Sequence, residues 1–307
     1  MQSIKSGVWP TMITPFTPDQ TIDYAAVERM IDYYHRRGVA GLFAVCQSSE
    51  MFHLTLAEKT ELTRFIADNC PDGLQVIASG HTAERVDDQV REAEAIMGAG
   101  SQAYVLLPNR LAAEDESDEV LIERMSEFTD RLPGVPLGIY ECPYPYKRLL
   151  TPKVLRACVD SRRFWFIKDT CCSIAQIAER LQIIRDSGIK LFNANSATLL
   201  ESLQLGADGY SGVMANFHPE LYVWLCKHYA AEPEQAERLQ QLLGSASMAE
   251  YQYYPVNAKY SMSLQGVPME SGSRVKDAAR FTESQRKEIA QLTGLAARIG
   301  EAMGIHV

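Results

Sequence analysis

The 307-residue chain lacks both a long hydrophobic run and a basic tract. No stretch approaches the ~18 apolar residues of a membrane span, and the first ten residues, MQSIKSGVWP, lack the apolar centre of a signal peptide. The formal charge of −9 disfavours nucleic-acid and anionic-membrane partners, because those surfaces repel an acidic protein. Arg36-Arg37 and Lys147-Arg148 are pairs only. We therefore expect a cytoplasmic protein with neither kind of partner.

A cysteine framework is also missing. The seven cysteines are odd in number and include no CxxC pattern. The adjacent Cys171 and Cys172 are poorly placed for a metal cage or an ordinary disulfide. These features predict reduced thiols and no metal site.

Short apolar runs alternate with segments of helical period along most of the chain, and no linker rich in Pro, Gly or Ser separates them. The expected strands are 7–13, 39–45, 74–78, 103–107, 135–140, 164–167, 190–193 and 209–213. The expected helices are 24–37, 56–69, 82–99, 118–131, 152–159, 174–186, 197–205 and 221–229. Eight strand–helix units predict a (β/α)8 barrel, an α/β fold of the TIM type. An open doubly wound sheet is the alternative.

The barrel is expected to occupy residues 1–230. The remainder, 231–307, carries no strand signal and reads as helical throughout, with helices at 236–250, 256–264 and 283–303. It predicts a C-terminal helical segment packed on the barrel, as an interface or a lid. Thr82 is expected to provide a partial N-cap for the helix that follows it.

Lys168 is the most conspicuous candidate for chemistry. The active site of such a barrel lies at the C-terminal ends of its strands. Lys168 follows the aromatic run Phe164-Trp165-Phe166-Ile167, so it should be partly desolvated. Desolvation lowers the pKa of an amine and makes it more nucleophilic. The alternative is an ordinary lysine paired with Asp169.

Two further candidates stand at neighbouring strand ends. Tyr140 closes the strand before Lys168, and a phenol beside an imine can transfer protons. Its alternative is a core tyrosine. Gln47, Ser48 and Ser49 form a strand-to-helix turn whose N–H groups and hydroxyls suit a carboxylate or a phosphate.

These three sites together resemble the dihydrodipicolinate synthase / N-acetylneuraminate lyase family, the class I pyruvate-dependent aldolases and dehydratases, over nearly the whole chain. The family's G-[IV]-K-[DE]-[TS] segment matches 166–170 except at its first glycine. Its Y-[ND]-x-P segment corresponds to 140–143, and its G-[TS]-[TS]-G-E turn to 46–50. Lys168 and Tyr140 are 28 residues apart, one strand–helix unit, as in the family.

The resemblance implies roles for individual residues. Lys168 would form a Schiff base with a 2-keto acid and Tyr140 would transfer protons, with no cofactor or metal. Ser48 and the backbone of Gln47–Ser49 would hold the keto acid's carboxylate, and the backbone at Ser211 would line the pocket. The resemblance also implies a homotetramer or a homodimer.

The chain departs from the family where the two name-giving enzymes would be recognised. Gln47 replaces a hydroxyl of the family's proton relay, and Pro108-Asn109-Arg110 replaces its tyrosine segment. Pro145 occupies the position of the arginine of dihydrodipicolinate synthases, and Ala197 that of the acidic residue of the lyases. The resemblance therefore implies neither of these two enzymes.

The resulting hypothesis is a lyase that cleaves, condenses or dehydrates pyruvate or a 2-keto-3-deoxy sugar acid through an imine. Arg110, Glu141, Lys147 and Asn195 are the candidates for contacting the distal part of the substrate. One alternative is a non-catalytic or sensing keto-acid-binding protein on the same barrel. Another is a phosphate- or flavin-binding barrel built on Gly206–Gly212.

Overall fold

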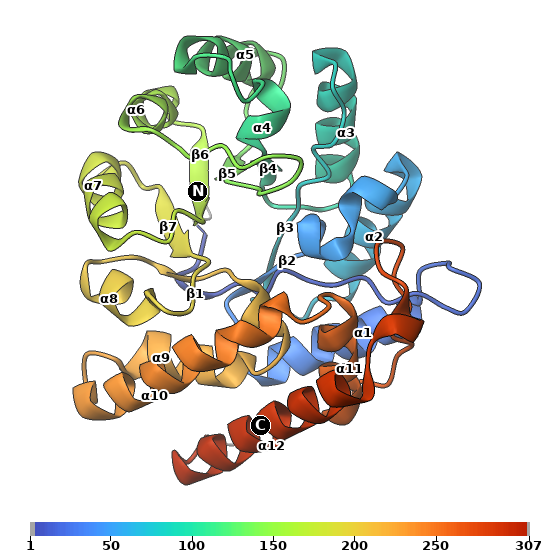
Figure 1. Cartoon of the computed structure of the whole chain (residues 1–307). Coiled ribbons are helices and arrows are strands. Elements are labelled where there is room, and N and C mark those ends of the chain that lie inside the picture. Colours follow the sequence, from blue (N-terminus) through green and yellow to red (C-terminus); the bar gives the residue numbers. More distant parts are fainter. Residues whose placement is uncertain (1–3, 306–307) are drawn as a thin grey trace.

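Strands and helices alternate along the chain and enclose a barrel in the computed structural model, which describes residues 4–305 (Figure 1). The strands are β1 Gly7–Val8, β2 Gly41–Phe43, β3 Gln75–Ile77, β4 Tyr104–Leu106, β5 Leu137–Tyr140, β6 Phe164–Asp169, β7 Lys190–Asn193 and β8 Gly209–Tyr210. The helices of the barrel are α1 Tyr24–Arg36, α2 Leu56–Asn69, α3 Val86–Gly98, α4 Pro108–Leu111, α5 Asp118–Asp130, α6 Pro152–Ser161, α7 Ile174–Ile184, α8 Leu199–Gln204 and α9 Pro219–His228. The C-terminal helices are α10 Pro233–Ala246, α11 Val256–Leu264 and α12 Glu283–Ala302. Short 3₁₀ helices are η1 Gln47–Ser49, η2 Met51–His53, η3 Val213–Asn216, η4 Ser247–Tyr251 and η5 Ala278–Arg280.

The strands close into a ring in which every pairing between strands is parallel. One sheet has the order β1-β8-β7-β6-β5-β4, and β2 pairs with β3. Single parallel bridges, Thr11 to Phe43 and Ala78 to Tyr104, join the two sheets at both ends. The expected (β/α)8 barrel is confirmed, and the doubly wound alternative is wrong, because an open sheet would leave two unpaired edges.

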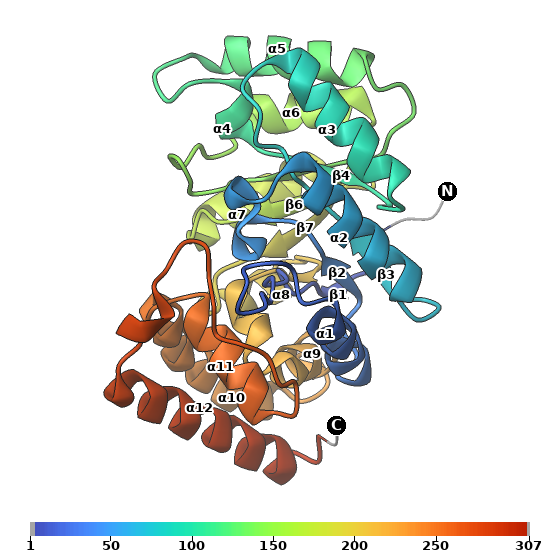
Figure 2. The same cartoon turned by 90° about the vertical axis from the view of Figure 1, so that its right-hand side faces the viewer.

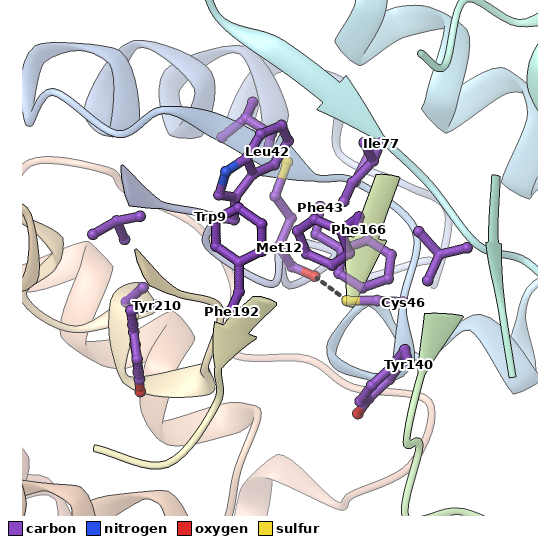
Figure 3. Close-up of a cluster of buried hydrophobic side chains, with 14 of the residues drawn as sticks. Trp9, Met12, Leu42, Phe43, Cys46, Ile77, Tyr140, Phe166, Phe192 and Tyr210 are labelled. Carbon is purple, nitrogen blue, oxygen red and sulfur yellow. Dashed lines mark hydrogen bonds between the residues drawn. The ribbon is translucent and has the colours of Figure 1, made fainter. Parts of the chain in front are cut away.

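Aromatic side chains fill the barrel below the strand ends. Trp9, Phe43, Phe166 and Phe192 are fully buried and converge from different strands (Figure 3). The Phe166 and Phe192 rings stack at 4.6 Å, and Trp9 meets Phe166 edge-on at 5.7 Å. Gly41 makes room for this layer, since a Cβ atom there would lie 2.3 Å from the Trp9 ring. The barrel interior is therefore closely packed, and this aromatic layer forms the floor of any cavity at the C-terminal ends of the strands.

The alternation of β6 places its residues on two different surfaces. Phe166 points into the barrel, and Lys168, two residues later, points the same way. Asp169 faces outward, where it forms an ion pair with Arg180 of α7. Strand geometry therefore separates Lys168 from its sequence neighbour.

The C-terminal helices lie together along one side of the barrel, beside α9 and α1 (Figures 1 and 2). The expectation that this segment is helical throughout is wrong for residues 267–277, which form a loop. No helix within residues 4–305 combines the length and the apolar character needed to cross a bilayer.

Two local predictions in the barrel need correction. Helix α3 begins at Val86, and Thr82 does not cap it. Instead the Thr82 hydroxyl donates to Glu92 at 2.7 Å and accepts from the Lys59 ammonium at 2.6 Å. Helix α4, which begins at Pro108, was not expected from the sequence. Both differences arise in the loops after strands, where buried ion pairs and turns outweigh helical periodicity.

Candidate active site

A cavity of about 760 Å³ opens above the aromatic floor, at the C-terminal ends of the strands. The barrel side of its wall includes Gln47, Ser48, Tyr140, Lys168, Ala194, Asn195 and Gly212. The C-terminal segment supplies Glu250, Tyr251, Tyr254, Pro255, Val275 and Lys276. This is the face on which barrel enzymes carry their active sites.

Lys168 lies in this cavity and is only 3% exposed. Its amine lies 4.4 Å from the centre of the Tyr140 ring, and no carboxylate of residues 4–305 forms an ion pair with it. Desolvation lowers its pKa to about 8, and weaker influences from Cys46, Cys142 and Glu250 oppose that shift. Asp169, the alternative partner, is occupied by Arg180. A buried amine with a lowered pKa can act as a nucleophile near neutral pH.

Tyr140 ends β5 directly opposite Lys168 in the strand register. Burial raises the pKa of its phenol well above the ordinary value, so the hydroxyl stays protonated. The hydroxyl donates to Oε1 of Gln47 at 3.3 Å, and the Cys142 thiol donates to the same oxygen at 3.3 Å. An amide oxygen only accepts, so Gln47 orients the phenol but cannot pass a proton onward.

The turn of η1 presents two backbone donors to the cavity. The N–H groups of Gln47 and Ser48 have no acceptor among the residues that the structure describes, while Ser49 N–H donates to Cys46 and Glu50 N–H to Gln47. The Ser48 hydroxyl lies 3.1 Å from that of Thr11. Ser48 and Gln47 line the cavity as expected. Free N–H groups at such a turn suit an anion.

Two of the expected site serines instead hold the barrel wall. Ser49 is fully buried, with its hydroxyl 2.8 Å from the Met12 carbonyl and 2.7 Å from that of Ala44. Ser211 is also fully buried, and its hydroxyl donates to the Trp9 carbonyl at 3.0 Å. The cavity wall includes neither serine, and the neighbouring Gly212 reaches it instead. The backbone contacts expected at Ser49 and Ser211 stay predictions.

Glu141 is not a substrate contact in this structure. It lies outside the strand ring, fully buried, in an ion pair with Arg180 at 2.7 Å. Its carboxylate also accepts the Leu150 and Thr170 N–H groups, each at 2.7 Å. Arg180 thus joins the residue after Tyr140 to Asp169, the residue after Lys168. The expectation for Glu141 fails because adjacent residues of a strand face opposite sides.

Arg110 lies in a different cavity, of about 380 Å³, with Glu116 and Arg124 in its wall. Helix α4 carries its guanidinium away from the Lys168 cavity, and its ion-pair partner is the exposed Glu84 at 3.8 Å. The prediction that Arg110 lies in the same cavity as Lys168 is therefore wrong, because the two side chains line different cavities.

The remaining two candidates do line the Lys168 cavity. Lys147 is exposed at its mouth and donates to the Thr170 carbonyl. Asn195 donates to the Cys172 sulfur at 3.4 Å and accepts from the Thr198 N–H at 3.1 Å. Both residues therefore belong to the wall of the Lys168 cavity.

Asn109 belongs to the segment that replaces the family's tyrosine segment, and it shapes the loop that carries Lys147. Its amide nitrogen donates to the carbonyls of Cys142 at 2.8 Å, Tyr144 at 3.0 Å and Tyr146 at 2.6 Å. The loop is thereby held against the cavity, where the Tyr144 ring meets Phe52 at 4.8 Å.

The alternative of a phosphate- or flavin-binding site concerned the segment Gly206–Gly212. The glycines of this segment lie at different ends of the barrel. Gly206 precedes β8 and lies at the N-terminal end of that strand, in a hollow with Asp208. Gly209 closes the seam with β1, because a Cβ atom there would lie 1.9 Å from the Gly7 carbonyl oxygen. Only Gly212 reaches the Lys168 cavity. The segment therefore does not form one phosphate loop.

The largest omission from the sequence reasoning is the contribution of the C-terminal segment. Glu250 lines the cavity, and its charge acts on Lys168. Tyr254 is half-buried beside Ser48 and Thr11, whose hydroxyls interact with its phenol. The run Glu250–Tyr254 contains three tyrosines in five residues, the one signal that could have drawn attention to it.

Comparison with known proteins identifies relatives along almost the entire chain. Residues 5–293 match the model of the Dihydrodipicolinate synthetase family. A 4-hydroxy-tetrahydrodipicolinate synthase of Chlorobium phaeobacteroides is 25% identical, over 94% of this chain and 97% of that protein. The putative 2-dehydro-3-deoxy-D-gluconate aldolase YagE of Escherichia coli is 26% identical, over 72% of this chain and 73% of its own.

Solved structures share the fold. The crystal structure of E. coli YagE in complex with pyruvate superposes with a TM-score of 0.83 at 22% identity, covering 96% of this chain and 98% of that one. A sialic acid aldolase of Ruminococcus gnavus superposes with a TM-score of 0.83 at 17% identity, covering 95% and 98%.

Proposed function

The chain belongs to the dihydrodipicolinate synthetase family, and on that premise we propose that it is a lyase that works through a lysine imine. The substrate would be pyruvate or a 2-keto-3-deoxy sugar acid, undergoing aldol cleavage, condensation or dehydration. Lys168 is the imine-forming residue and Tyr140 the proton-transferring residue. Relatives with the names of a synthase and of aldolases, one of them solved with pyruvate, support this assignment.

One observation carries the proposal: a buried amine without an ion-pair partner in residues 4–305 faces a cavity, with a phenol against it. The pKa of Lys168, lowered to about 8, leaves about a tenth of the amine neutral at pH 7. The Tyr140 ring is 4.4 Å from that amine. An amine held in this state needs only a bound ketone to react.

The free donors of η1 orient that ketone. With its carboxylate on the N–H groups of Gln47 and Ser48, a 2-keto acid presents its carbonyl carbon to Lys168. Attack and loss of water give a protonated imine, which withdraws electrons from the bond between C3 and C4. Lys147 and Asn195 then contact the distal hydroxyls or carbonyl. Self-association into a dimer or tetramer is proposed for this chain and is measured by light scattering after gel filtration.

Borohydride reduction tests the proposal. Protein incubated with pyruvate and then reduced should gain the mass of one reduced pyruvate adduct, and peptide mapping should locate it on Lys168. Lys168→Met should abolish the adduct. Lys153→Met, which removes an exposed lysine of α6 outside the cavity, should leave it unchanged. No adduct with pyruvate or with longer 2-keto acids would exclude the imine mechanism.

A keto-acid-binding protein on the same barrel is the second candidate, and the contacts of Gln47 favour it. The amide oxygen of Gln47 accepts from both Tyr140 and Cys142, in place of a relay hydroxyl. An adduct on Lys168 without turnover of any 2-keto-3-deoxy acid or pyruvate–aldehyde pair would select this candidate.

A further inference from the structure

We propose that Glu250 is a second acid–base residue of this site, exchanging a proton with the oxygen on C4 of the substrate while Tyr140 serves C3. The inference rests on the proposed lyase function and deepens it. An imine lyase acting on a 4-hydroxy-2-keto acid must move protons at two separate atoms, C3 and the C4 oxygen. Its active site therefore needs two proton-transferring side chains, one near C3 and one near the C4 oxygen.

The cavity wall supplies two such groups from different segments of the chain. Tyr140 lies against the Lys168 amine, at the end of β5. Glu250 reaches the same cavity from η4 in the C-terminal segment. Its carboxylate makes no ion pair with Lys168, although its charge acts on that amine. The Glu250 carboxylate is therefore not tied up by the amine and can interact with another atom of a bound substrate.

Glu250 is distinct from the other carboxylate of the cavity wall. Glu50 is held by Lys259 at 3.0 Å, by the Ser273 hydroxyl at 3.0 Å and by the Arg274 N–H at 2.6 Å. Glu250 has no ion pair within the described residues and interacts with the phenol of Tyr251. It is the carboxyl left available to a bound molecule.

The surroundings of Glu250 shift the pKa of its carboxyl upward. Burial raises the pKa of its carboxyl, and the Tyr251 hydroxyl and the charge of Lys168 partly oppose that shift. The neighbouring Tyr210 and Tyr254 are neutral phenols, because burial raises the pKa of each. A carboxyl with a raised pKa that faces a cavity is suited to exchange protons with a bound substrate.

The position of Glu250 is fixed relative to the carboxylate-binding turn. The Asn257 amide nitrogen, fully buried in α11, donates to the Ala249 carbonyl at 2.7 Å. Lys259, two residues along the same helix, forms the buried ion pair with Glu50 at the end of η1. Helix α11 thus connects the residue before Glu250 to the turn that presents the Gln47 and Ser48 N–H groups.

In cleavage, the Glu250 carboxylate takes the proton of the C4 hydroxyl as the bond between C3 and C4 breaks. That electron pair forms the C2–C3 double bond, the protonated imine becomes an enamine, and the aldehyde leaves. Tyr140 then protonates C3, and water releases pyruvate and the free amine. Both side chains finally restore their protonation states with solvent.

Deuterium exchange separates the two roles, because pyruvate has no C4. The test compares wild type, Glu250→Gln and Tyr140→Phe in two assays: exchange of the pyruvate methyl hydrogens in D2O, and turnover of a panel of 4-hydroxy-2-keto acids. Glu250→Gln should keep borohydride trapping and methyl exchange within about threefold of wild type and lose turnover by about 10²–10⁴-fold. Tyr140→Phe should lose both methyl exchange and turnover, with borohydride trapping on Lys168 retained. Glu237→Gln, an exposed carboxylate of α10, is the matched control.

Three results would overturn the assignment. Glu250→Gln could retain turnover within about threefold, or it could lose methyl exchange as severely as turnover, which would mark Glu250 as a positioning residue for Lys168. Wild type that exchanges pyruvate hydrogens but turns over no member of the panel would also count against it. Glu250→Asp, which keeps the carboxyl, should recover part of the turnover and guards against misfolding of the glutamine variant. Failure of the lyase proposal itself is recognised separately, because wild type would then show neither trapping nor exchange.

Discussion

Replacing Arg180 with methionine should destabilise the protein more than any surface substitution. The Arg180 side chain is 4% exposed and joins two fully buried carboxylates, Glu141 at 2.7 Å and Asp169. It also donates to the Leu150 carbonyl at 3.0 Å. Arg180→Met leaves both carboxylates buried without a cation, and breaking a buried ion pair in this way costs about 3–5 kcal/mol.

The assay is urea denaturation followed by circular dichroism at pH 8 and pH 5.5. The loss of unfolding free energy should be smaller at pH 5.5, because a buried carboxyl without its cation has a raised pKa and is neutralised by protonation as the pH falls. Arg91→Met is the control: its pair with Asp88 is on the surface, and its loss should cost less than about 1 kcal/mol.

The prediction extends to the site, because Glu141 and Asp169 directly follow Tyr140 and Lys168. Arg180→Met should also slow imine trapping in the fraction that remains folded. A loss below about 1 kcal/mol at pH 8 would refute the reasoning, since it would mean that water or rearranged backbone donors replace the guanidinium at no cost.

Three other predictions concern the barrel and its chemistry. The rate of imine trapping should rise with pH, with a midpoint near the Lys168 pKa of about 8, because only the neutral amine attacks; a flat profile from pH 6.5 to 9 in stopped-time trapping would contradict it. Tyr140→Phe should lower steady-state turnover about 10²–10⁴-fold with Lys168 still reducible by borohydride, and equal loss of both would contradict the assigned role. Gly41→Ala should destabilise the fold by about 1–3 kcal/mol in urea melts, because its Cβ would lie 2.3 Å from the Trp9 ring; an unchanged midpoint would show that the ring can move freely.

Local periodicity was sufficient to predict the barrel. Each strand–helix unit is recognisable from about thirty or fewer neighbouring residues, and the strand at 190–193 was placed at its observed bounds. The same periodicity failed after the strands, at Thr82 and at Pro108, and again at 267–277. In those places the backbone follows hydrogen bonds to residues that are distant in the chain, which no short window contains.

Strand alternation could have corrected one site prediction before the structure was known. If Lys168 and Tyr140 both point into the barrel, then Asp169 and Glu141 must point outward, towards the helices. The sequence alone did not indicate their shared partner, Arg180, because it lies on α7 and only the packing of that helix on the sheet brings it to both carboxylates.

The sequence by itself therefore determined the architecture and placed Lys168 and Tyr140 at strand ends, because period and motif are properties of short segments. Only the tertiary structure decided which side chains share one cavity. Helix α4 places Arg110 in a different cavity from Lys168. The side chains of Ser49 and Ser211 are buried in the barrel wall, and the C-terminal segment adds Glu250 to the Lys168 cavity. The physical reason is that a cavity forms where distant segments pack together, and helix packing and buried ion pairs fix that arrangement rather than the local period of any one segment.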